Sequence, residues 1–485
     1  MPVAPATLLS DATTEEGGTL ERNTEIYIRP YPFPYVAALA LSNDCDSCSM
    51  EAFEDWHAFV NGRASTPYGE GLGLEVGDSF WIWQGGSLGV ALSTGASDEP
   101  AQEPAYTERL AEIGRAGWLD TLHSLGNWRQ DYKSFRHDLG TREQVERSLE
   151  MLEAKGLKPF VYVNHSFSPS NISGPWGFYQ KIDDPTHPMY AMDLIRKFGF
   201  RYFWPDYAQD VEKFGDQIVY ESDAELRQAI KDYRQWKLIY KRTSITEAHV
   251  IDFPLELPEL RALHLAMFNR TIIRVPALDG SPMAAFKRYR GGSAADESSF
   301  HLQVRPENLD SLEQGGGAVI VYQHFGVTRD GPDNTKRRST PPVLSANSVR
   351  AWYDIARRAE AGRLFVTTTG RLLDYLCLAE RLAFTVKKTP DQWTIRLAPL
   401  GKSSEWSLRP KHELLNGLAF VVPADAPEIV VLDSGRKKLK FMRGADPARP
   451  GRHAVYNQWQ KLEWIPASLP GQRLEPSQMA LELRR

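Results

Sequence analysis

The sequence has few cysteines, no excess of basic charge and no long apolar run, and each absence excludes a class of protein. Three cysteines in 485 residues are too few for a disulfide framework, and the pair Cys45 and Cys48 has no second pair to complete a zinc site. The formal net charge is −5 and the pI is near 6.2, which argues against a nucleic-acid partner. No apolar run approaches the roughly 20 residues that span a bilayer, so no transmembrane segment is expected.

The composition is that of an ordinary soluble globular protein. Hydrophobic residues make up 42% of the chain and charged residues 25%. The first residues, "MPVAPATLLSDATTEEGG", have no basic start and no long apolar core, so we expect no signal peptide and a cytoplasmic location. The length is sufficient for two or three domains.

Helical and strand-like patterns alternate between residues 26 and 378. The stretch "REQVERSLEMLEAKG" has apolar residues at helical spacing and ends at Gly156, and the strand-like "PFVYVNH" follows it. The same order returns at 189–207, 307–324 and 348–376. Repeated units of this kind are typical of an α/β fold built as a parallel sheet or a (β/α) barrel.

The pattern changes after about residue 379. Short runs such as "WTIRLAPL" and "EIVVLDS" alternate with Pro, Asp and Gly, which is typical of β-strands joined by turns. We therefore predict three parts: an N-terminal extension at 1–25, the α/β domain at 26–378, and a small all-β, sandwich-like domain at 379–485.

Acidic and imidazole side chains follow several predicted strands. In "LSNDCDSC" Asp44 and Asp46 come directly after the apolar run "YVAALA", and His123, His165 and His324 each end a strand-like run. In a parallel arrangement these strand ends lie on one rim. Carboxylates and imidazoles together suit a divalent ion, zinc or one similar to it. A structural alternative remains open, in which the acids cap a strand and a helix and the histidines are hydrogen-bonded packing residues.

The order of these motifs resembles the polysaccharide deacetylase (NodB-homology) superfamily, whose members fold as a distorted (β/α) barrel. "LSNDCD" is similar to the opening "TFDD" motif with one residue inserted between the acids, and "HSLGN" to the "H-S/T-x-x-H" motif with Asn127 in place of the second histidine. "VNHSFSPSN" stands where "R-x-P-Y" is usual, "FWPDY" contains the Asp and Trp of the fourth motif, and "YQH" fits "L-x-H". The resemblance covers roughly residues 35–378 and is nearest to a divergent branch linked to bacterial surface-polysaccharide biosynthesis, such as that of lipopolysaccharide.

The resemblance implies a metal-dependent hydrolase that removes an acetyl group from an N-acetylated sugar or polysaccharide, with zinc as the expected ion. In this family one of the two acids is the catalytic base, and the other binds the metal together with histidines. A histidine later in the sequence is the general acid, and an aspartate orients it. Carried over by position, these residues are Asp44 (base), Asp46 and His123 (metal), His165 or Asn127 (completing the metal shell), His324 (acid) and Asp206 (orienting). Cys45 between the acids leaves open which of them is the base.

The third motif lacks its arginine, which leaves the base without its usual partner. Arg288 or Arg290, in "FKRYRGG", would supply that charge or bind substrate, and Trp204 and Asn164 are also assigned to substrate binding. Alternatives remain for these residues: barrel packing for Trp204 and a solvated charged turn for the two arginines. Asn127 caps a helix in the alternative interpretation, instead of binding metal.

Two other functions fit the same residues. One is a glycoside hydrolase on a related barrel, in which two carboxylates cleave a glycosidic bond without metal. The other is a carbohydrate-binding relative in which the altered second and third motifs reflect lost activity. Metal content separates the deacetylase from the glycoside hydrolase, and turnover with metal present separates it from the binding protein.

Overall fold

The computed structural model describes residues 25–45, 48–84, 89–94, 102–127, 141–165, 168, 170–172, 182–204, 271–289, 295–329, 336–338, 340–399 and 415–466. The helices in these ranges are α1 (Met50–Val60), α2 (Thr107–Arg115), α3 (Arg142–Ala154), α4 (Met192–Phe198), α7 (Phe300–Gln303), α8 (Pro306–Gly315), α9 (Ala346–Glu360) and α10 (Thr369–Arg381), with the 3₁₀ helix η4 (Glu297–Ser299).

Internal contacts divide the described residues into two compact units. The larger unit takes those of 35–373 and 461–466, and the smaller unit takes those of 25–34 and 374–460. This division differs from the predicted boundaries at 26, 378 and 379. The reason is the pairing of β1 (Tyr27–Ile28) with β19 (Ala419–Pro423), which places the start of the described chain with the C-terminal strands.

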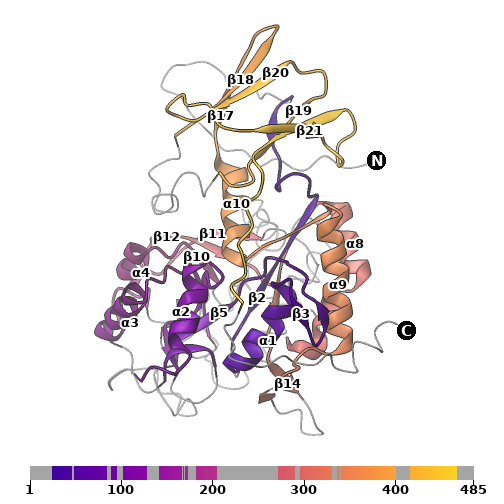
Figure 1. Cartoon of the computed structure of the whole chain (residues 1–485). Coiled ribbons are helices and arrows are strands. Elements are labelled where there is room, and N and C mark those ends of the chain that lie inside the picture. The colour runs from indigo at the N-terminus through magenta and orange to yellow at the C-terminus, as the bar shows by residue number, and fades with distance from the viewer. Residues whose placement is uncertain are drawn as a thin grey trace, which may run out of the picture. The chain divides into compact units, whose positions relative to one another are not determined.

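The main sheet of the larger unit is parallel over six strands, in the order β12-β10-β9-β7-β5-β6, and β11 is antiparallel to β12 at its edge. Its strands are β5 (Ser79–Gln84), β6 (Ala91–Thr94), β7 (Thr121–His123), β9 (Val161–Val163), β10 (Tyr202–Trp204), β11 (Ile272–Pro276) and β12 (Pro282–Phe286), and β8 (Gly126–Asn127) pairs with β5. In Figure 1 α3 and α4 lie next to each other beside this sheet.

A second sheet of the larger unit is also parallel, in the order β13-β2-β16. Its strands are β13 (Ala318–Gln323), β2 (Ala37–Asn43) and β16 (Leu364–Val366). Every residue of the central strand β2 is buried, as expected for a strand covered on both faces. A parallel bridge between Tyr289 and Val321 joins the two sheets. The predicted α/β fold with parallel strands is therefore confirmed, whereas the pairings of the described strands do not show a closed barrel.

Five helices, α3, α4, α8, α9 and α10, form where the sequence predicts helices, whereas α1, α2 and α7 were not predicted. Thr141 caps α3 in a reciprocal capping box with Gln144, and the helix buries Val145 and Leu149 on one face. The helix α8 begins with proline and ends at Gly316, whose φ of 63° lies in the left-handed region that glycine adopts without strain. Both helices lead into strands that carry candidate site residues, β9 and β13.

The smaller unit contains two sheets and the C-terminal end of α10. One sheet is antiparallel, in the order β1-β19-β22-β21, and the other joins β17 to β18 antiparallel and β18 to β20 parallel. The strands not yet given are β17 (Phe384–Lys388), β18 (Gln392–Leu397), β20 (Glu428–Leu432), β21 (Met442–Ala445) and β22 (Arg452–Tyr456). A fully buried ion pair between Arg29 and Asp446, with N···O 2.9 Å, ties β1 to the turn after β21. The predicted strand-like runs form strands, among them β18 in "WTIRLAPL" and β20 in "EIVVLDS". The described residues of this unit include the end of a helix and do not confirm a small all-β, sandwich-like domain.

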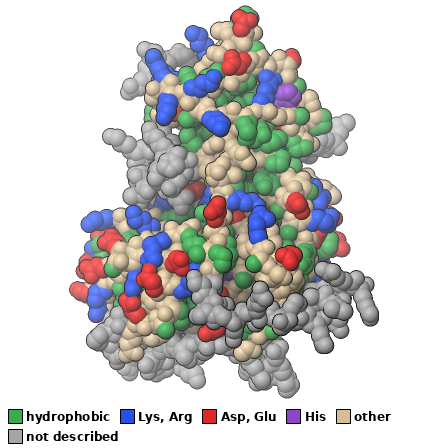
Figure 2. All heavy atoms as spheres, viewed as in Figure 1, with side chains coloured by type: hydrophobic (Ala, Val, Ile, Leu, Met, Phe, Trp, Pro, Cys, Tyr) green, Lys and Arg blue, Asp and Glu red, His purple; other side chains and the backbone are tan. Residues whose placement is uncertain are grey.

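Short hairpins complete the larger unit: β3 (Ser65–Thr66) with β4 (Gly69–Glu70), and β14 (Val327–Arg329) with β15 (Lys336–Arg338). Figure 2 shows acidic and basic side chains interspersed in the region of α2, α3 and α4, where Arg142 pairs with Asp193 and Arg115 with Glu108. Among the described helices, none combines the length and the apolar character needed to cross a membrane.

Candidate functional site

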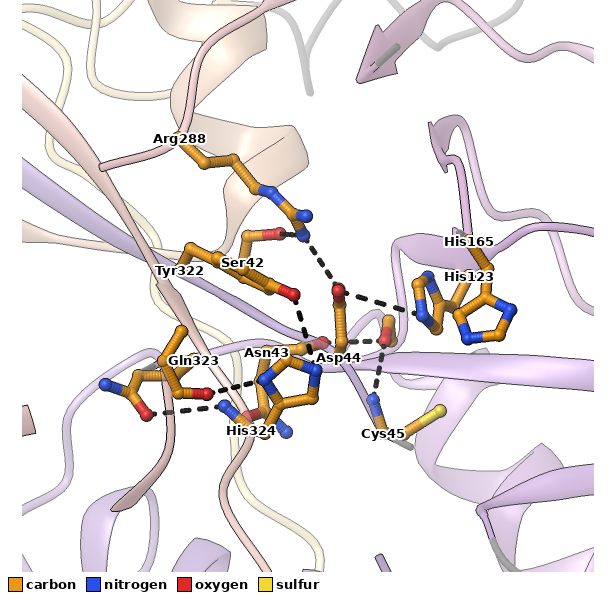
Figure 3. A network of polar contacts seen from close by, with 12 residues as sticks. Ser42, Asn43, Asp44, Cys45, His123, His165, Arg288, Tyr322, Gln323 and His324 are labelled. Atoms are coloured by element: carbon orange, nitrogen blue, oxygen red, sulfur yellow. Dashed lines mark hydrogen bonds and ion pairs between the residues drawn. The ribbon is translucent and has the colours of Figure 1, made fainter. Parts of the chain in front are cut away.

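Six of the side chains singled out in the sequence lie together in the larger unit, at or just beyond the carboxyl ends of parallel strands. Figure 3 shows most of this cluster, with Asp44 between Arg288 on one side and two histidines on the other. The six are Asp44 (after β2), His123 (end of β7), His165 (after β9), Trp204 (end of β10), Arg288 (after β12) and His324 (after β13). Parallel pairing brings these strand ends to one edge, which is where sites form in α/β folds.

Asp44 is the centre of the cluster. Its backbone N–H donates to the carbonyl of Gln323 at 2.9 Å, which fixes it at the junction of β2 and β13. One carboxylate oxygen accepts from Nη1 of Arg288 at 2.7 Å, and the other lies 3.7 Å from Nε2 of His123. The side chain is only 5% exposed, so this ion pair is shielded from water.

Arg288 is buried, not part of a solvated turn. It is 2% exposed, and its guanidinium carbon lies 3.5 Å from the ring centre of Trp204 and 3.8 Å from that of Tyr322. Nη1 also donates to the hydroxyl of Ser42 at 3.1 Å. The two rings fix the plane of the guanidinium, and its bonds to Ser42 and Asp44 fix its direction. The ring of Trp204 therefore packs against Arg288, and its centre lies 6.2 Å from that of Tyr322.

His123 and His165 lie beside Asp44 with Trp81. The two imidazole ring centres are 5.0 Å apart, and the ring of Trp81 meets each of them edge-on at 4.6 Å. Asp44 and His123 supply an oxygen and a nitrogen of the kinds that zinc accepts. In the part of the chain that the structure describes, no three His, Cys, Asp or Glu side chains are placed so as to hold a metal ion. Asp44 and His123 are therefore donors of a kind that zinc accepts, but the described residues do not by themselves form a metal site.

His324 has its two ring nitrogens in different settings. Nδ1 lies 2.5 Å from the carbonyl oxygen of Ala295, and Nε2 lies 3.3 Å from the hydroxyl of Tyr322. A carbonyl only accepts, so Nδ1 carries a hydrogen in this arrangement. The nitrogen that gains or loses a proton is then Nε2, which makes the residue suitable for proton transfer.

Other candidates are placed elsewhere or lie outside the described residues. The side-chain amide of Asn164 donates to the carbonyl of Ile172 at 2.8 Å and accepts from its N–H at 2.9 Å, so it holds the backbone after β9. Asn127 is described as part of β8, which pairs with β5. Asp46, Asp206 and Arg290 lie outside the described residues.

A buried polar network lies directly behind Asp44. The amide of Asn43 donates to both oxygens of Asp78, at 2.9 and 3.0 Å, and its own oxygen accepts from the N–H of Phe325 at 2.6 Å. Nε2 of His57 lies 3.1 Å from Asp78, while Nδ1 accepts from Asn61 at 3.0 Å. Because Nδ1 accepts, Nε2–H donates to Asp78. The network joins the start of β5 to the ends of β2 and β13, and so fixes the backbone on either side of Asp44.

Within this network, Asp78 and His57 change the free energy of unfolding with pH in opposite directions. Burial raises the pKa of Asp78 well above its usual value and lowers the pKa of His57 well below its usual value. The contribution of Asp78 is thus present below a pH of about 4 and is lost as the pH rises toward its raised pKa. The contribution of His57 is present above a pH of about 6.5 and is lost as the pH falls. Between these values the two oppose each other.

Single substitutions should separate these two contributions. Asp78→Asn leaves His57 as the titrating member of the pair, and His57→Gln leaves Asp78. The free energy of unfolding should therefore rise more steeply with pH, between about 4 and 6.5, in Asp78→Asn than in His57→Gln. Urea denaturation of both variants at several pH values measures the two slopes. If the free energy of unfolding changed with pH in the same way in both variants, this interpretation of the network would be wrong.

Sequence reasoning missed the residues that surround the charged groups. Tyr322 lies two positions before His324, so strand alternation could have placed both on one side. Ser42 precedes Asp44 by two positions in the same way. Trp81 lies inside an apolar strand and His57 on the buried face of α1, where they resemble packing residues. Only their contacts in the folded chain reveal them.

Comparison with known proteins finds neither a matching family model nor a matching curated protein. The case for a function therefore rests on the geometry of the site and on the motif resemblance.

Proposed function

We propose that the protein is a metal-dependent hydrolase that removes an acetyl group from an N-acetylated sugar or polysaccharide. The observation that supports this most is the position of Asp44, held by Arg288 and flanked by His123, with His324 at the neighbouring strand end. A carboxylate base, an imidazole acid and further imidazole donors are what metal-assisted amide hydrolysis requires. The proposal includes a distorted (β/α) barrel of the deacetylase type, a substrate from bacterial surface polysaccharide and a cytoplasmic location.

His123 would hold the ion, zinc being the expected one, together with Asp46 and with His165 or Asn127. When bound, the ion supplies polarisation of the acetyl carbonyl and a lower pKa for water at the site. Asp44 takes the proton of the attacking water, and Arg288 keeps the carboxylate in position for that transfer. His324 gives a proton from Nε2 to the sugar nitrogen as the C–N bond breaks, so that acetate and a free amine are formed. The ring of Trp81 and the burial of the cluster limit access of bulk water.

Removal and return of the ion test the proposal. The purified protein should contain about one divalent ion per chain, and dialysis against a chelator should abolish deacetylation of an N-acetylated sugar. Added zinc should restore it. Elemental analysis and acetate release, measured on the same samples, follow both quantities. His123→Ala should lose the ion, whereas His453→Ala, on β22 in the smaller unit, should keep it.

Three results would count against the proposal. The first is a protein that holds no ion after purification or after add-back, with a melting temperature that zinc does not change. The second is metal-independent cleavage of glycosidic bonds, which would favour the glycoside hydrolase instead. The third is sugar binding without turnover when the ion is present, which would favour a binding protein.

A further inference from the structure

We propose that the substrate carries a carboxylate, as a uronic acid does, and that the free edge of the Arg288 guanidinium binds it. This inference deepens the proposed function and rests on it, because it assigns a substrate class to the same site. It starts from hydrogen-bond donors of Arg288 and Trp204 that the site itself does not use.

Among the described residues, Arg288 has hydrogen-bond partners for only one of its three guanidinium nitrogens. Both bonds of its guanidinium, to Asp44 and to Ser42, come from Nη1, and Figure 3 shows both dashed lines leaving that one nitrogen. Nε and Nη2 are buried and have no hydrogen-bond partner among the described residues. Nε1 of Trp204, whose ring stacks on the same guanidinium, is also buried without a partner there.

Buried donors of a charged group are costly to leave unsatisfied, so a ligand that satisfies them gains affinity. The unused atoms all donate, which calls for a ligand group that accepts. Nε–H and Nη2–H lie side by side in the plane of the guanidinium and point in nearly the same direction, and this edge matches the two oxygens of a carboxylate. A single hydroxyl or carbonyl would satisfy one donor and leave the other unpaired.

The surroundings favour this orientation of an anion. The rings of Trp204 and Tyr322 pack against the guanidinium, with their centres 3.5 and 3.8 Å from its carbon, so a carboxylate would bind along the Nε–Nη2 edge, in the plane of the group. Asp44 occupies the Nη1 corner, on the other side of the group from Nε, which keeps the two carboxylates apart across the positive charge. The substrate carboxylate would thus orient the sugar relative to Asp44 without displacing it.

Binding of simple sugars tests the inference without turnover. Calorimetric titration of the whole protein with glucuronate and with glucose compares two ligands that differ in the carboxylate and carry no acetyl group. We expect glucuronate to bind roughly tenfold or more tightly than glucose, the usual worth of hydrogen bonds to a charged group. Arg288→Lys keeps the charge but lacks the two-donor edge, and should abolish the preference.

Arg201→Lys is the matched control. Arg201 is buried and stacked on Phe160 and Tyr202, but it precedes β10 and so lies at the opposite end of that strand from Trp204. The preference for glucuronate should survive this change. If Arg288→Lys does not fold, Trp204→Phe keeps a ring over the guanidinium while removing Nε1–H, and should weaken glucuronate binding more than glucose binding.

Equal affinities for the two sugars, no measurable glucuronate binding, or a preference unchanged in the variants at 288 and 204 would overturn the inference. Tighter binding of glucose 6-phosphate than of glucuronate would overturn the assignment to a carboxylate. Acetate release from neutral and uronic N-acetyl sugars is measured separately. Deacetylation of neutral sugars alone would support the proposed function and contradict this inference. A preference for glucuronate without any deacetylation would support the carboxylate site and contradict the proposed function.

Discussion

Asp44→Asn is expected to lower turnover on an N-acetylated sugar by about 10²–10⁴-fold, the usual worth of a general base. Asparagine keeps the shape of the side chain and can still accept a hydrogen bond from Arg288, but it cannot take the proton of water. The ion content should remain nearly unchanged if Asp44 acts as the base. Kinetics of acetate release and elemental analysis of the same preparations measure both effects.

The substitution should also destabilise the fold, because it leaves the buried charge of Arg288 without a counter-charge. Breaking a buried ion pair in this way costs about 3–5 kcal/mol. Asp446→Asn is the matched control, since Asp446 is paired with Arg29 in an equally buried pair within the smaller unit. It should show a comparable loss of stability with normal turnover per folded molecule. Loss of the ion in Asp44→Asn would instead make Asp44 a metal ligand and Asp46 the candidate base.

His324→Ala should lower turnover on an acetamido sugar by about 10²–10⁴-fold, with much less effect on an activated acetate ester. The nitrogen of an amide must be protonated to leave, whereas an activated ester releases its oxygen without that help. Nε2 of His324 is the expected proton donor, because the contact of Nδ1 with Ala295 fixes the ring orientation.

Paired assays on the amide and ester substrates, with the ion measured in each sample, distinguish an acid from a structural residue. A structural role would reduce both activities together, since damage to the site does not depend on the leaving group. His453→Ala, a histidine of β22 outside the cluster, should change neither activity. Equal losses on the two substrates in His324→Ala would remove the assignment of His324 as the acid.

Much of the secondary structure could be predicted because its causes are local. The helix α3 follows from apolar spacing and a capping box within a few residues of sequence, and α8 from a proline start and a glycine end. The strands β9 and β13 follow from short apolar runs that stop at polar residues. The candidate residues Asp44, His123 and His324 were found for the same reason: each comes directly at or after such a strand.

The contacts of those residues depend on which segments meet in three dimensions, so the sequence left their partners open. Through the motif resemblance it offered Arg288 or Arg290 as the partner of the base, and the folded chain pairs Arg288 with Asp44. Arg288 lies 244 positions from Asp44, and its sequence surroundings, "KRYRGG", are those of an exposed turn. The pairing of His57 with Asp78 joins the helix α1 to the residue before β5, and local sequence does not distinguish either residue from a packing or capping residue.

The sequence by itself predicted several helices and strands in their order, the α/β character of residues 26–378 and the polar ends of the strands. These features follow from periodicity and capping, which act over a few residues. The tertiary structure decided that Arg288 is buried between Trp204 and Tyr322, that this candidate arginine forms an ion pair with Asp44, and that β1 joins the C-terminal strands. The physical reason is that a buried charge and a strand edge are satisfied by whichever complementary group the fold brings to them, however distant it is in the chain.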